Sequence, residues 1–82
     1  AVISIRPNPN SGNFSLELSE NMDNAELSVR NIRGQQIYYK QFNRLLLKGE
    51  SILLNIDFPD KGIYFVIFKS NKKQFISKLM VR

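Results

Sequence analysis

The chain of 82 residues contains no cysteine and no histidine. The lack of cysteine excludes disulfide bonds, thiol nucleophiles and thiolate zinc sites, and the lack of histidine excludes catalytic triads in which an imidazole is the base. The composition therefore excludes most familiar enzyme mechanisms, and we expect a domain without a cofactor or a metal site. The absence of cysteine does not identify the cellular compartment, because disulfides mark oxidising environments but their absence does not mark a reducing one.

Long apolar segments are also missing. No run approaches the roughly 18 apolar residues that a membrane-spanning helix requires. The apolar stretch at residues 1–5 is too short for a signal peptide, and no basic segment precedes it. We expect one domain over residues 1–82, which would be part of a longer secreted protein if the protein is exported.

Acidic residues are absent from the last quarter of the chain. The net charge is +5, and residues 61–82 hold six bases and no acid, whereas residues 1–28 hold one base and four acids. Such bases can dock on an acidic receptor or keep an edge strand from aggregating. We favour docking for Lys78 and Arg82, and the second role for Lys72 and Lys73. Nucleic-acid binding is disfavoured, because no RNP-type motif accompanies the aromatic residues.

Short strand-like runs separated by turn residues make up most of the chain. Seven are predicted, at residues 2–5, 13–18, 25–31, 35–42, 51–57, 63–69 and 73–81. In the second run Phe14, Leu16 and Leu18 share one face, since successive strand side chains point to opposite sides. The fifth and seventh runs repeat this alternation. The strand spacing of about ten residues predicts an all-β fold, an antiparallel seven-stranded β-sandwich with an immunoglobulin-like layout.

Two segments depart from the alternating pattern. Residues 63–68 read IYFVIF and are apolar throughout, so alternation cannot show which face is buried, and we expect the most central strand there. Residues 43–51 include Leu45, Leu46 and Leu47, and we expect a loop whose leucines tuck under the edge of a sheet.

The stretch PNPNSGNF at residues 7–14 precedes the first long strand. Pro7 and Pro9 lack backbone N–H donors, and Asn8 is held extended because it precedes a proline. The next three residues, ending at Gly12, supply a turn. On physical grounds alone, these residues shape a rigid corner more readily than they form a recognition site.

Three later landmarks accompany this corner: NIRG at residues 31–34, GIY at residues 62–64 and KLMVR at residues 78–82. Together, the four landmarks resemble the C-terminal sorting domain (type A) of type IX secretion substrates, also called the Por secretion system. The resemblance covers residues 5–82 and marks as recognition residues Pro7, Asn8, Pro9, Gly12, Phe14, Gly34, Gly62, Tyr64, Lys78, Leu79, Met80, Val81 and Arg82.

The resemblance implies a non-catalytic secretion signal attached to an N-terminal cargo domain. The cargo would reach the periplasm through a signal outside this chain, and a shuttle receptor and an outer-membrane translocon would then deliver it to the cell surface or the medium. A sortase-like peptidase would usually remove the sorting domain. We expect Phe14 to be buried, and Tyr64 to place its ring in the core and its hydroxyl at the surface.

Other interpretations stay open from the sequence. The last strand, as an exposed edge, could pair with a receptor strand and would also permit weak self-association. The alternative function is an immunoglobulin-like accessory module of a surface enzyme that binds carbohydrate or mediates adhesion. It would need exposed aromatic residues along one sheet face or a groove between loops. A structural spacer within a multidomain protein is a third interpretation.

Overall fold

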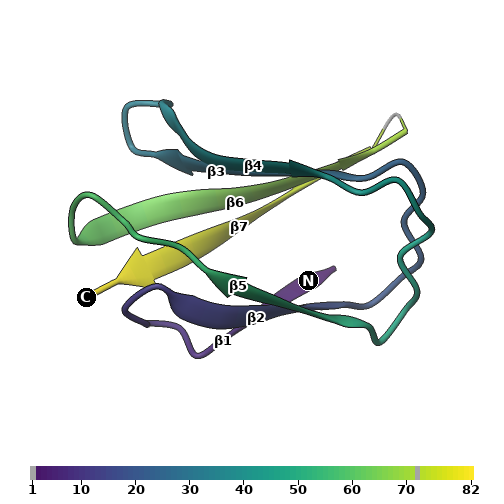
Figure 1. The fold of residues 1–82 in the computed structure, drawn as a ribbon, viewed down its shortest axis with the longest axis horizontal. Helices are drawn as coiled ribbons and strands as arrows, with labels where there is room; N and C mark the ends of the chain where they lie inside the picture. Colours follow the sequence, from purple (N-terminus) through teal and green to yellow (C-terminus); the bar gives the residue numbers. More distant parts are fainter. Residues whose placement is uncertain (1, 72) are drawn as a thin grey trace.

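Seven antiparallel strands form two sheets in the computed structural model, which describes residues 2–71 and 73–82. The strands are β1 (Ile3–Arg6), β2 (Asn13–Leu18), β3 (Glu26–Asn31), β4 (Gln36–Gln41), β5 (Ser51–Asn55), β6 (Gly62–Ser70) and β7 (Lys73–Val81). A three-stranded sheet has the order β1-β2-β5, and a four-stranded sheet has the order β4-β3-β6-β7. The two sheets face each other as the layers of a sandwich (Figure 1). Within the described ranges, no helix is long and apolar enough to cross a membrane.

The predicted all-β sandwich is confirmed, with strand bounds that differ from the predicted ones by at most two residues at either end. The strand order is also immunoglobulin-like. β1, β2 and β5 take the places of strands A, B and E, and β3, β6 and β7 take those of strands C, F and G. β4 pairs with β3, so it belongs to the four-stranded sheet.

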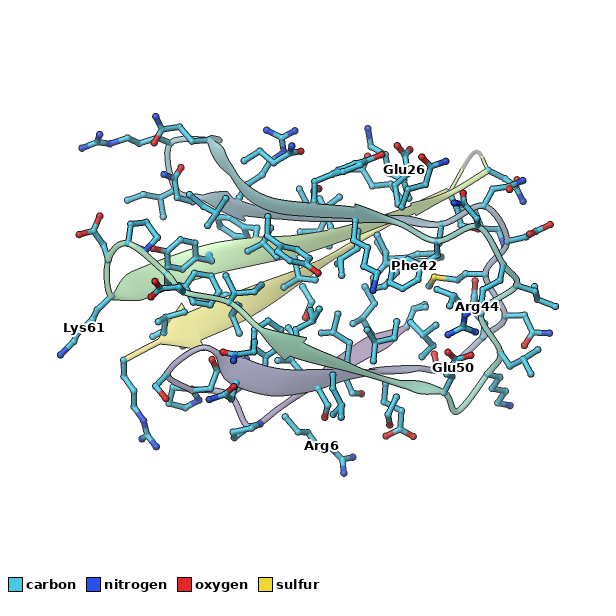
Figure 2. All side chains as sticks on the ribbon, viewed as in Figure 1. Arg6, Glu26, Phe42, Arg44, Glu50 and Lys61 are labelled. Atoms are coloured by element: carbon cyan, nitrogen blue, oxygen red, sulfur yellow. The ribbon has the colours of Figure 1, made fainter. Side chains whose placement is uncertain are left out.

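The core lies between the sheets and is built from side chains that alternate inward along each strand. Phe14, Leu16 and Leu18 of β2 are buried, as their spacing predicted. Phe42 follows β4 and stacks on Phe68 of β6, with ring centroids 6.2 Å apart; Figure 2 shows Phe42 between the two sheets. Full burial of one such side chain stabilises the fold by about 1.5–3 kcal/mol relative to exposure.

β6 is buried on one face only, and this is the face that its all-apolar sequence could not identify. Its inward side chains are buried: Tyr64, Val66 and Phe68. Its outward side chains are only half-buried: Ile63, Phe65 and Ile67. β6 is central in the sense that β3 and β7 cover its two edges. Neighbouring strands cover the edges of a strand but leave its outer face open. When every residue of the strand is apolar, no alternation of polar and apolar residues identifies that face.

The loop between β4 and β5 places one of its three leucines in the core. Leu46 is buried and exchanges two backbone hydrogen bonds of 2.8 Å with Met22. Leu45 and Leu47 are exposed. The expectation that these leucines tuck under the sheet edge therefore holds for Leu46 alone, because neighbouring residues in an extended segment point to opposite sides.

Every second connection lies at the same end of the sandwich, because consecutive strands run antiparallel. The β1–β2 corner at residues 7–12, the β3–β4 turn at residues 32–35, the β5–β6 loop at residues 56–61 and the C-terminal end of β7 gather there, on the left in Figure 1. We call this the motif end, because all four sequence landmarks meet at it. β1 runs toward the motif end, so its first residue lies at the opposite end of the sandwich.

Candidate functional site

The corner at residues 7–12 is hydrogen-bonded to the end of β7. The side chain of Asn8 spans two residues of that strand: Nδ2 donates to the carbonyl of Lys78 at 3.1 Å, and Oδ1 accepts from the N–H of Met80 at 2.8 Å. The N–H of Asn10 donates to the carbonyl of Met80 at 3.0 Å, and its carbonyl accepts from the N–H of Arg82 at 2.9 Å. The corner therefore lies along the outer edge of β7 like a short parallel strand.

Asn10 and Gly12 fix the shape of the corner from within. Asn10 is buried; its Nδ2 donates to the carbonyl of Pro7 at 2.9 Å, and its Oδ1 accepts from the N–H of Gly12 at 2.9 Å. Gly12 has a φ of 120°. A Cβ at this position would overlap with the carbonyl oxygen of Ile56, so only glycine fits. The peptide bonds that precede Pro7 and Pro9 are both cis.

Three aromatic rings pack beneath the corner. Phe58, from the β5–β6 loop, contacts Phe14 at a centroid distance of 6.4 Å and Tyr64 at 4.5 Å. The hydroxyl of Tyr64 donates to the carbonyl of Asp60 at 2.7 Å and so closes the loop. The predicted burial of Phe14 is confirmed. The ring of Tyr64 lies in the core as predicted, but its hydroxyl does not stand at the surface: the residue is 3% exposed and the hydroxyl binds the loop backbone.

All the recognition residues proposed from the sequence lie at or beside the motif end, but they fall into two groups. The buried ones are Gly12, Phe14, Tyr64, Leu79 and Val81. The exposed ones are Pro7, Asn8, Pro9, Gly34, Lys78, Met80 and Arg82, and Gly62 is half-buried. The buried group builds the fold, and a partner can contact the exposed group directly.

A hollow of about 380 Å³ separates the β3–β4 turn from the β5–β6 loop at the motif end. Gly34 and Gly62 shape these two connections with positive φ values of 83° and 135°. The walls of the hollow are mixed: polar and charged side chains alternate with the apolar side chains of Ile32, Ile37 and Ile63. Ile32 is 74% exposed. The sequence analysis missed it, although an apolar residue inside a polar turn is itself a signal of a contact surface.

Asn10 and Phe58 also escaped the sequence analysis. Asn10 stood within the corner as an ordinary turn residue, and only its burial and its bonds to the end of β7 reveal its role. Phe58 precedes a proline in a loop, where no strand pattern predicts burial. Both residues act through neighbours that are distant in sequence, so no local pattern could have identified them.

Cationic side chains project from the end of β7. Lys78 and Arg82 are exposed at the motif end, as a docking role requires. Lys73 lies at the opposite end of β7, where it forms an ion pair of 3.9 Å with Glu20. Lys72 lies outside the described residues. Across residues 2–71 and 73–82, no group of three or more acidic side chains could hold a metal ion.

The chain matches the family model described as the secretion system C-terminal sorting domain (Por) over residues 4–82. No curated protein matches it. The matched range contains all four landmarks, so the family match decides for a sorting signal over an accessory binding module. Because the match spans nearly the whole chain, the chain belongs to the C-terminal sorting domains of the Por (type IX) secretion system, which are non-catalytic signal domains.

Proposed function

We propose that the corner at residues 7–12 and the last five residues form one recognition unit that the type IX secretion machinery reads at the outer membrane. The partners in this proposal are a shuttle receptor and the translocon, followed by a sortase-like peptidase that removes the domain from its cargo. The cargo passes through the periplasm and ends at the cell surface or in the medium.

The observation that carries this proposal is the set of hydrogen bonds between the corner and the end of β7. Asn8 and Lys78 are 70 residues apart in sequence, and one of these bonds joins them directly. Only the folded domain presents the exposed side chains of both segments side by side. The signal is therefore a folded surface and not a linear peptide.

The same bonds change the expected mode of recognition. The carbonyl of Lys78, both backbone groups of Met80 and the N–H of Arg82 are bound by Asn8 and Asn10. A receptor strand could pair with this edge only by displacing the corner. We therefore propose that the machinery recognises side chains at this place and does not extend the sheet.

A reporter fusion tests the proposal. A fluorescent protein with a periplasmic signal and these 82 residues at its C-terminus is expressed in a type IX-competent strain and in a strain without the translocon. We expect surface or extracellular reporter in the first strain and periplasmic accumulation in the second. Equal delivery in both strains would refute the proposal.

Point variants locate the recognition unit better than a deletion does. Removing residues 78–82 would also remove Leu79 and Val81 from the core and unfold the domain. Lys78→Glu and Arg82→Glu reverse exposed charges instead, and we expect several-fold lower delivery at an unchanged Tm. Lys48→Glu, in the exposed loop at the opposite end, is the matched control. Delivery of all three variants at the same level would exclude a role for the terminal cations.

A further inference from the structure

The outer face of the four-stranded sheet carries a continuous set of apolar side chains. We call it the outer apolar row, and it consists of Ile63, Phe65 and Ile67 on β6 and Ile76 and Met80 on β7. Ile76 and Met80 are 58% and 38% exposed. The row is continuous because Ile63 pairs with Met80, and Ile67 with Ile76, across the two strands.

Basic side chains border the outer apolar row. Arg30 on β3 and Lys78 on β7 stand on either side of Phe65 in the register of the sheet, and Lys69 lies further along β6. Among the described side chains of this face, the acid is Glu26, which accepts a hydrogen bond from a tyrosine hydroxyl of β4. Figure 2 shows Glu26 on this outer side. The face therefore combines apolar surface with an excess of positive charge.

A hollow of about 220 Å³ lies next to the row, above Ser28. The small side chain of Ser28 stands between Ile67 on β6 and Tyr39 on β4 in register. Arg30 and Lys69 contribute to the walls of the hollow. Glu26, Gln36 and Gln74 also line this hollow, so it suits a polar side chain of a partner, and a carboxylate that enters would meet both cations.

From these features we infer that the outer face of the four-stranded sheet is a second docking surface, which takes a protein surface of apolar side chains bordered by carboxylates. This inference rests on the proposed function, since the partner belongs to the type IX machinery. The surface continues into the motif end: Ile63 lies in the outer apolar row and also lines the hollow between the two turns. One partner can therefore cover both.

Charge and size argue against a second copy of the chain as the occupant. A two-fold dimer through this face would bring together two surfaces that each carry an excess of positive charge. Residues 63–69 rise about 20 Å and four strands span about 14 Å, which gives roughly 300 Å² of flat face. A stable interface needs about 800 Å² from each partner. The face suits a transient contact, which a transported substrate must be able to leave.

Site-specific crosslinking tests the inference. Ile76→Cys introduces a single thiol, because the chain has no cysteine. Leu53→Cys is the matched control, since Leu53 is 82% exposed on the outer face of the three-stranded sheet. Both proteins carry a photo-crosslinker on the thiol and are mixed with purified translocon and shuttle receptor in detergent. We expect at least fivefold more crosslinking from position 76, and equal yields would overturn the inference.

Binding measurements with the same purified components separate the occupants. Ile76→Ser and Lys69→Gln should each weaken binding several-fold at an unchanged Tm, and Leu53→Ser should bind like the parent. Affinities equal to that of Leu53→Ser would refute the inference. Two further outcomes would refute it. The first is that the parent binds anionic phospholipid vesicles alone and Ile76→Ser does not. The second is that the parent forms a dimer in sedimentation velocity and Ile76→Ser does not.

Reporter delivery distinguishes this inference from the proposed function. If the parent reporter fails to reach the surface of a competent strain, the proposed function fails. If the parent is delivered and the Ile76→Ser reporter is delivered equally well, only the second docking surface fails. Reduced delivery of the Ile76→Ser reporter, with normal delivery of the Leu53→Ser reporter, supports both.

Discussion

Replacing Gly12 with alanine should destabilise the whole domain, because two separate effects meet at this position. Gly12 has a φ of 120°, a region that L-residues rarely adopt, and the added Cβ would overlap with the carbonyl oxygen of Ile56. The N–H of Ile56 donates to the carbonyl of Gly12 at 2.9 Å. The backbone shift that relieves the overlap would also break this bond.

The magnitude follows from these two effects. Backbone strain in a sparsely populated region costs about 1–3 kcal/mol. Leaving a buried hydrogen-bonding group unpaired costs about 1–3 kcal/mol more. The sum of about 2–6 kcal/mol is a large part of the roughly 4–12 kcal/mol expected for a domain of this length. Gly34→Ala is the matched control, because Gly34 has a φ of 83° with no atom near the added Cβ. It should cost only about 1–2 kcal/mol.

Urea denaturation of the purified domain, followed by circular dichroism, measures both variants. With an m-value of about 1.5 kcal/mol per M, the midpoint for Gly12→Ala should fall by about 1.3–4 M, and that for Gly34→Ala by about 0.7–1.3 M. Equal midpoints for the two variants would show that the contact with Ile56 does not determine the conformation of the corner.

Three further predictions concern single side chains. Asn8→Ala should cost about 1–2 kcal/mol and speed hydrogen exchange at the amide of Met80, which loses its acceptor; unchanged protection would contradict this. Tyr64→Phe should cost about 1–2 kcal/mol in urea denaturation, because its hydroxyl closes the β5–β6 loop; a variant as stable as the parent would exclude that role. The hydrogen bond from Arg44, together with one from a backbone N–H, holds the pKa of Glu50 below its ordinary value of 4.5. The ion pair should therefore stabilise the fold above about pH 4.5, and this effect should be lost as the pH falls through the lower pKa of the folded state. Glu50→Gln should flatten that part of the profile of stability against pH. An unchanged profile would show that the pair contributes nothing.

The strands could be predicted from the sequence wherever one face of the strand is exposed to solvent. The alternation in β2 and β5 fixed which side chains enter the core, and the structure confirms them. In β6 every position is apolar, so the sequence could not show that Phe65 and its outward neighbours border solvent. Local pattern reveals a buried face only through contrast with a polar one.

The contacts between the corner and β7 could not be predicted from local pattern. The resemblance marked both segments, but their pairing depends on a tertiary contact between Asn8 and Met80. The sequence analysis expected a free edge at the end of β7, whereas the corner occupies it. An asparagine side chain that mimics a strand leaves no periodic trace in the sequence.

The bonds from Asn8 and Asn10 to the last residues of β7 tie the first corner of the domain to its last strand. A polypeptide broken off before Met80 cannot close its corner, whatever its earlier residues are. A chain that is truncated within β7 would thus lose the recognition unit together with the fold, and an incomplete protein would not be secreted.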